Sequence, residues 1–140
     1  VTERIRRPEV SGCASVVSAY PDVRAYLLEM QRQMASADNV VMDGRDIGTV
    51  VLPDAEIKVF LTASAQERAR RRTLELEQRG TPQSYETTLR EIEERDWNDT
   101  HRATAPLRQA ADAVMLDTTQ LDFQASEEAL LRIIQERSGT

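Results

Sequence analysis

The chain has 140 residues, of which 40% are apolar and 30% charged, a composition typical of one soluble globular domain with a core of its own. Its net charge of −6 argues against a broad nucleic-acid surface, and no apolar run is long enough to span a bilayer. A single cysteine, Cys13, excludes an internal disulfide framework, and a single histidine, His101, argues against a histidine-based metal site. We therefore expect a cytoplasmic protein with no metal site and no nucleic-acid or membrane partner.

Two helices are expected in the first third of the chain. Pro8 opens a helix through about residue 20, and Pro21 opens a second helix at its first position, where a missing N–H costs nothing. Apolar residues recur at helical spacing from residue 23 to residue 34, so we expect this second helix to pack one face. Asp38 ends it.

Three short segments rich in valine or isoleucine are predicted to be strands. They cover residues 40–42, 57–61 and 113–116, and helical patterns of crossover length separate them. This alternation predicts a parallel sheet with helices packed on it.

Capping residues predict three further helices. Ser64 and Glu67 form a capping box for a helix that ends at Gly80, Ser84 caps a helix to about residue 100, and Asp122 caps the last helix. The buried stripe of that last helix is expected to comprise Phe123, Leu130, Ile133 and Ile134. Residues 64–102 are nearly all polar or charged, so this helical pair is either a solvated face or a lid that closes over a ligand.

The segment from residue 40 to residue 49 carries the main functional signal. A buried strand is predicted to run into a turn that presents Arg45 and Asp46 between glycines. Ligand crevices of α/β proteins form at the carboxyl ends of strands. An arginine offers a planar fork of donors for a phosphate, and an aspartate accepts from an exocyclic amine. A nucleoside monophosphate carries both groups.

Two arginine-rich segments give weaker signals. Arg95, Asp99 and Arg102 share one helical face, a pattern that alone is more typical of a solvated salt-bridge ladder. The sequence at 105–107, Ala-Pro-Leu, breaks this helix and places the three at a helix end, where functional groups gather. Residues 68–72 hold four arginines, usually a solvated face, whose mutual repulsion an anion such as a triphosphate would relieve.

Together these motifs resemble bacterial cytidylate kinase. The matching segments are 9–11, 23–24, 43–55, 57–64, 67–72, 95–107 and 113–119. The resemblance implies a P-loop NTPase fold of the nucleoside monophosphate kinase type, an α/β fold whose parallel sheet is flanked by helices, here incomplete, with residues 64–102 as a helical lid. It also implies transfer of the γ-phosphoryl group of ATP to CMP or dCMP with Mg²⁺.

The resemblance further implies roles for individual residues. The CMP site would comprise Ser15, Arg24 and Asp46 at the cytosine, Arg45 and Arg102 at the phosphate, and Arg95 and Asp99 at the ribose hydroxyls. Within this set the catalytic residues would be Arg45, Arg95 and Arg102. The ATP phosphates or the adenine would face Arg68, Arg71 and Arg72 on the lid.

Elementary chemistry supports the assignment of Asp46 to the base. A carboxylate accepts from N4 of cytosine, whereas uracil presents an acceptor at that position. A buried carboxylate left unpaired against uracil costs about 1–3 kcal/mol, which would favour CMP over UMP.

One family motif does not occur in these 140 residues, the glycine-rich phosphate loop that ends in Gly-Lys; the only lysine, Lys58, lies in a predicted strand. We therefore expect residues 1–140 to be the C-terminal part of one kinase core domain, inactive alone, with Mg²⁺ held mainly by the nucleotide and that loop. In the family's parallel sheet another strand lies between those that correspond to residues 40–42 and 57–61, so the resemblance implies that these two strands lack their shared central partner. Their edges would then re-pair, self-associate or recruit the missing piece.

Three alternatives stay open. The chain is a non-catalytic nucleotide-binding or regulatory remnant of the same family, or a nucleoside monophosphate kinase of different base choice. A helical interaction module is the third, and the strand–turn pattern at 43–46 disfavours it.

Overall fold

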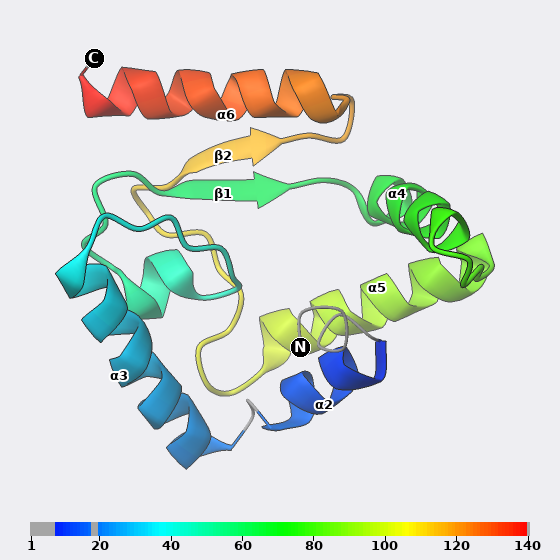
Figure 1. Cartoon of the computed structure of the whole chain (residues 1–140), viewed down its shortest axis with the longest axis horizontal. Coiled ribbons are helices and arrows are strands. Elements are labelled where there is room, and N and C mark those ends of the chain that lie inside the picture. Colours follow the sequence, from blue (N-terminus) through cyan, green and yellow to red (C-terminus); the bar gives the residue numbers. More distant parts are fainter. Residues whose placement is uncertain (1–7, 18–19, 140) are drawn as a thin grey trace. The chain divides into compact units, whose positions relative to one another are not determined.

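The computed structural model describes residues 8–17 and 20–139 (Figure 1). It divides into two compact units, Val1–Met42 and Asp43–Thr140. Each unit is described by itself below.

The first unit contains helices α2 (Pro8–Val17) and α3 (Pro21–Ala37), which begin at the two prolines as predicted. The prediction that α3 packs one face is wrong. None of its residues is buried, and Tyr26 and Met34 are 68% and 53% exposed. Helical spacing shows that apolar residues share a face, but it does not supply a partner that covers the face.

The predicted strand at residues 40–42 is also wrong. These residues have no regular structure, and Val41 is fully exposed. A strand needs a neighbour for its N–H and C=O groups, and among the described residues no strand pairs with this segment. Re-pairing of the segment with another strand is therefore not seen, while self-association remains a prediction.

The sheet of the second unit has two parallel strands, β1 (Val59–Thr62) and β2 (Val114–Asp117). Their register runs from Val59 opposite Val114 to Thr62 opposite Asp117. Both strands lie within two residues of their predicted bounds. Their carboxyl ends meet at one edge of the sheet, so Ala63 and Thr118 lie side by side, both buried.

Helix α6 (Phe123–Ser138) contacts β2 and begins where the Asp122 carboxylate accepts a hydrogen bond from the Ala125 N–H at 2.8 Å (Figure 1). Its predicted buried stripe is only partly correct. Leu130 and Ile133 are half-buried, but Phe123 is 86% exposed and Ile134 37% exposed. A sheet of two strands is too narrow to cover the whole stripe, and Phe123 stands at the very start of the helix.

Helices α4 (Ala65–Gln78) and α5 (Tyr85–His101) pack against each other (Figure 1). Ala69 and Leu76 of α4 and Thr88 of α5 are buried. In the described parts of the chain, no helix combines the length and the apolar character needed to cross a membrane.

The predicted caps of α4 and α5 are confirmed, with one correction. The hydroxyl of Ser64 accepts from the Glu67 N–H at 3.2 Å, and Ser84 caps α5 in the same way. The reciprocal half of the capping box is absent: the Glu67 carboxylate binds Arg70, and the Ser64 N–H donates to Thr119 Oγ1 at 2.9 Å. The nearby arginine outcompetes a neutral N–H for the carboxylate.

Candidate functional site

A short irregular turn presents Arg45 and Asp46. Residues 44–46 form a bend that leads into a single π-helical turn, η1 (Ile47–Val51). The Asp46 carbonyl accepts from the Val50 and Val51 N–H groups at 2.9 and 3.2 Å. A Cβ at Gly44 would lie 2.9 Å from Ile47 Cγ1, so the tight turn favours glycine.

The carboxylate of Asp99 lies at the centre of three arginines. Arg45 Nε donates to Asp99 Oδ2 at 2.8 Å, across 54 residues of sequence. Arg95 Nε lies 3.9 Å from the same oxygen, and Arg102 Nη1 lies 4.0 Å from Oδ1. The side chain of Asp99 is only 16% exposed. The face of α5 that carries Arg95 and Asp99 therefore contacts the turn at residues 44–46 and is not only a solvated ladder of ion pairs.

Arg102 extends this cluster to Asp46. Its Nη2 lies 3.7 Å from Asp46 Oδ1, and its Nε donates to the Ala105 carbonyl at 2.6 Å. Nη2 is buried and has no hydrogen-bond partner within the described residues. A buried donor without an acceptor costs free energy, so a ligand acceptor at this position would be stabilising.

We call Arg45, Asp46, Arg95, Asp99 and Arg102 the arginine–aspartate cluster. Three arginines and two aspartates leave it one positive charge in excess. The structure therefore brings together, within the second unit, all five predicted CMP-site residues that belong to that unit. A surplus of rigid guanidinium forks beside a half-buried carboxylate suits a small anion such as a phosphate.

The other two predicted cytosine-binding residues belong to the first unit. Arg24 lies on α3 with a half-buried side chain. Ser15 falls within α2, but its side chain lies outside the described part of the structure. Both assignments remain predictions.

The predicted lid arginines bind groups of the protein itself. Arg68 grips both carboxylate oxygens of Asp96, at 2.9 and 2.5 Å, and donates from Nε to the Ala63 carbonyl. Arg71 donates to the Thr118 carbonyl at 2.6 Å and so ties α4 to the end of β2. The side chain of Arg72, 39% exposed, pairs with Glu75 on its own helix. The anions that relieve the repulsion in this arginine run are therefore carboxylates of the chain.

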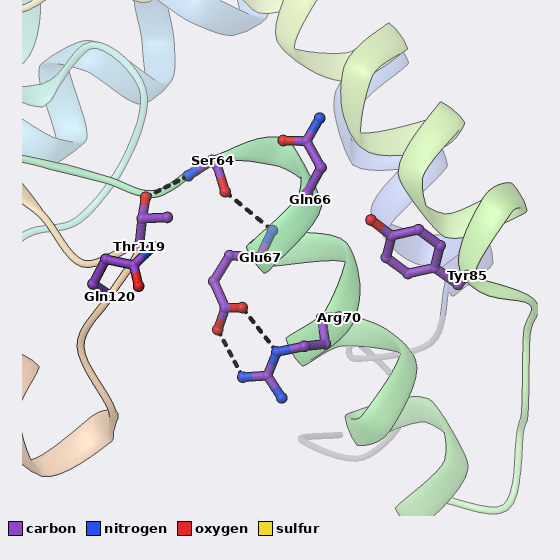
Figure 2. A pocket seen from close by; sticks show the side chains of 7 residues that line it. All are labelled: Ser64, Gln66, Glu67, Arg70, Tyr85, Thr119 and Gln120. Carbon is purple, nitrogen blue, oxygen red and sulfur yellow. Dashed lines mark hydrogen bonds and ion pairs between the residues drawn. The ribbon is translucent and has the colours of Figure 1, made fainter.

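An open pocket of about 410 Å³ lies at the carboxyl ends of the two strands (Figure 2). Its lining residues are Ser64, Gln66, Glu67, Arg70, Tyr85, Thr119 and Gln120. On one wall, hydrogen bonds from Arg70 and Arg71 lower the pKa of Glu67 to about 2. No sequence motif marked this pocket, although Ser64 and Thr119 each closely follow a predicted strand, and that position could have indicated it.

Sequence reasoning also missed an aromatic pair on α5. Trp97 and His101 stack with ring centroids 4.5 Å apart, and Trp97 is 62% exposed. As the only tryptophan of the chain, two residues from both Arg95 and Asp99, it is a natural fluorescence reporter for the arginine–aspartate cluster.

Comparison with known proteins decides the family. The sequence model of the family "Cytidylate kinase" matches residues 1–136. The chain belongs to the cytidylate kinase family. It is 51% identical over 140 residues to a cytidylate kinase of Desulfitobacterium hafniense (strain Y51), with 100% of the chain and 60% of that protein covered.

Two further relatives give the same result. A cytidylate kinase of Carboxydothermus hydrogenoformans is 55% identical over 134 residues, which cover 96% of the chain and 60% of that protein. One of Fervidobacterium nodosum is 48% identical over 137 residues, which cover 98% of the chain and 63% of that protein. The chain thus spans about 60% of the length of these curated relatives. Its helix-flanked parallel sheet is consistent with part of a nucleoside monophosphate kinase fold.

Proposed function

We propose that this chain carries the CMP-binding residues of a kinase that transfers the γ-phosphoryl group of ATP to CMP or dCMP. The observation that carries the proposal is the arginine–aspartate cluster, in which Arg102 Nη2 is buried without an acceptor. Membership of the cytidylate kinase family supports the choice of CMP over other small anions.

The phosphate of CMP would bind between Arg45 and Arg102. Arg45 Nε donates to Asp99, while the two Nη groups of Arg102 lie 3.7 and 4.0 Å from carboxylate oxygens of Asp46 and Asp99, too far for hydrogen bonds. A phosphate dianion would give the two Nη groups of Arg102 an acceptor. It would also change the net charge of the cluster from one positive charge to one negative charge. Charge-assisted contacts of this kind are about twice as strong as neutral hydrogen bonds.

The base and the ribose would occupy the aspartate side of the cluster. Asp46 would accept from N4 of cytosine, and Asp99 and Arg95 would contact the ribose hydroxyls. The Asp46 side chain is mostly buried at 16% exposed, so an unmatched uracil carbonyl facing it would be poorly compensated by water.

In the transfer step an oxygen of the CMP phosphate attacks the γ-phosphorus of ATP, and the bond to the β–γ bridging oxygen breaks to release ADP. Little covalent help is needed; alignment of the two nucleotides and stabilisation of charge decide the rate. Arg45, Arg95 and Arg102 would supply that charge. Mg²⁺ would be held mainly by the nucleotide and by the glycine-rich phosphate loop of the family.

ATP would lie toward the lid arginines. Arg72 would have to leave only a carboxylate on its own helix to bind a phosphate, whereas Arg68 and Arg71 would have to leave acceptors on other segments of the protein. Closure of the α4–α5 pair over ATP would therefore be coupled to the breaking of these contacts.

A second candidate function is nucleotide binding without catalysis. The observation in its favour is that these 140 residues contain no glycine-rich loop that ends in Gly-Lys. Addition of ATP and CMP to the chain tests this candidate, because formation of ADP and CDP would contradict binding without catalysis.

A fluorescence titration tests the proposed CMP site. Trp97 is excited at wavelengths that nucleotides do not absorb while CMP is added to the unmodified chain, to Arg102→Met and to Arg72→Met. We expect saturable binding that weakens by at least about tenfold in Arg102→Met, since a charge-assisted contact contributes about 1.5–3 kcal/mol. Arg72→Met removes the same charge as Arg102→Met, but it should bind CMP with the affinity of the unmodified chain. Equal affinity in all three chains would contradict the site.

Self-association is a separate proposal. Both strands have an edge that no described strand pairs, and Leu61 and Met115 are 61% and 56% exposed. Open edges of this kind favour pairing between copies. Sedimentation velocity over a range of concentrations should show a dimer or larger species; a monomer at all concentrations would contradict it.

A further inference from the structure

We propose that the turn at residues 105–107 is a positioning device, which holds Arg102 so that its two Nη groups, and not its Nε, face the ligand. This inference rests on the proposed CMP site and assigns a role to residues that do not themselves contact the nucleotide.

The backbone of Ala105 is strained. Its φ of +49° is the only positive value at a non-glycine residue in the described ranges. The left-handed region disfavours any residue with a Cβ, so such a conformation persists only where its surroundings hold it. In this chain the surroundings are two hydrogen bonds: Arg102 Nε donates to the Ala105 carbonyl at 2.6 Å, and the Leu107 N–H donates to the Asp99 carbonyl at 2.8 Å.

These two bonds fold the turn back on the last turn of α5. Asp99 and Arg102 are both members of the arginine–aspartate cluster, so the turn fixes one of them through its backbone and the other through its side chain. Pro106 locks the connection between the two bonds, because its ring fixes φ.

The bond to Ala105 determines which edge of the Arg102 guanidinium can bind a ligand. A guanidinium can grip two oxygens side-on through Nε and one Nη, or end-on through both Nη groups. Because Nε is already engaged by Ala105, only the end-on edge remains. Its two nitrogens lie 4.0 Å from Asp99 Oδ1 and 3.7 Å from Asp46 Oδ1, beyond hydrogen-bond distance, and Nη2 is buried.

The turn thereby limits Arg102 to long ion pairs with the carboxylates of its own site, at 3.7 and 4.0 Å, and prevents a short two-pronged pair. If Nε were released, the fork could rotate and form a two-pronged pair with Asp99 or Asp46, as Arg68 does with Asp96. A phosphate would then have to break that pair before it could bind. The strain at Ala105 keeps the end-on edge available.

Three variants test this role. Ala105→Val makes the left-handed conformation costly, Ala105→Gly tolerates it, and Ala103→Val makes the same change of side chain two residues away, where φ is not positive. The first measurement is hydrogen exchange of the Arg102 Nε–H by ¹⁵N NMR without ligand, assigned through the signal that disappears in Arg102→Lys. The second is CMP affinity from the fluorescence of Trp97.

We expect the Arg102 Nε–H to exchange at least about tenfold more slowly than that of Arg72, whose side chain is 39% exposed, since the Arg102 Nε–H is held by a short charge-assisted bond. Ala105→Val should lose this protection and bind CMP about tenfold more weakly, while Ala105→Gly and Ala103→Val stay within about twofold of the unmodified chain. Normal CMP affinity in Ala105→Gly would show that residue 105 needs the left-handed conformation and not an alanine side chain.

Exchange of the Arg102 Nε–H as fast as that of Arg72 would overturn the inference even if Ala105→Val failed to fold. Unchanged CMP affinity in a folded Ala105→Val chain would also overturn it, while leaving the CMP site intact. Failure of the proposed function looks different: no variant binds CMP, although the Arg102 Nε–H remains protected.

Discussion

Asp96→Asn is expected to lower the free energy of unfolding by about 1–2 kcal/mol. The Asp96 carboxylate receives two hydrogen bonds from Arg68, at 2.9 and 2.5 Å, and both side chains are about one-third exposed. A hydrogen bond to a charged group contributes about 1.5–3 kcal/mol when buried, and partial exposure reduces this toward the 0–1 kcal/mol of a surface pair. Because the pair joins α4 to α5, its loss should lower the midpoint of thermal unfolding by about 3–8 °C.

Thermal unfolding followed by circular dichroism is the assay, with Arg72→Gln as the matched control. That variant removes an i,i+3 pair within α4, between Arg72 and Glu75, which are 39% and 41% exposed, and it should cost less than about 0.5 kcal/mol because such a pair joins no second helix. A double-mutant cycle of Arg68→Gln with Asp96→Asn cancels the bond from Arg68 to the Ala63 carbonyl. A coupling energy near zero, or a control that costs as much as Asp96→Asn, would refute the reasoning.

Three further predictions concern acid stability, base choice and the core. Hydrogen bonds from Arg70 and Arg71 lower the pKa of Glu67 from 4.5 to about 2, so the stabilisation by the Glu67 carboxylate is complete above the unfolded-state pKa and is lost as pH falls through the folded-state pKa. In urea unfolding, Glu67→Gln should therefore lose less stability than the unmodified chain between pH 4.5 and 2. An equal loss in the two chains would contradict this prediction. Asp46→Asn should reduce the preference for CMP over UMP by about tenfold in competition titrations, because an amide can donate to the uracil carbonyl; unchanged preference would remove Asp46 from the base site. Leu76→Ala, at a side chain 7% exposed, should cost about 2–3 kcal/mol in urea unfolding, and the control Leu74→Ala, at 48% exposed, less than about 1; equal costs would place the core elsewhere.

Local signals allowed correct prediction of the elements that depend on local chemistry. Ser64, Ser84 and Asp122 each cap the helix that was expected to follow, and Gly80 ends α4 with φ at +72°. Capping and left-handed termination involve residues within four positions of one another, so the sequence displays them directly.

Features that depend on distant partners were harder to predict. Residues 40–42 have the composition of a strand but no described neighbour to pair with, and α3 has the spacing of a packed helix but exposes Tyr26. The half-formed capping box has partly the same origin, because the Ser64 N–H donates to Thr119, which lies 55 residues further along the chain. Composition and periodicity describe what a segment can do, whereas pairing requires a partner in space.

The candidate site shows the same division. The shared face of Arg95, Asp99 and Arg102 follows from helical geometry, and their proximity to Arg45 was expected only through the family resemblance. The bond from Arg102 to Ala105 had no sequence signal, since no rule predicts that an alanine before a proline adopts a positive φ.

Thermal unfolding of the chain in excess CMP, with UMP as the control, tests most directly whether the arginine–aspartate cluster is a cytidine nucleotide site. A ligand that binds only the folded chain raises the midpoint, by about 2.7 kcal/mol of added stability at a concentration one hundred times its dissociation constant. We expect CMP to raise the midpoint of a cooperative transition, UMP to raise it less, and Arg102→Met to lose the shift. A transition that neither nucleotide moves, or that both move equally, would contradict the assignment of this cluster to CMP.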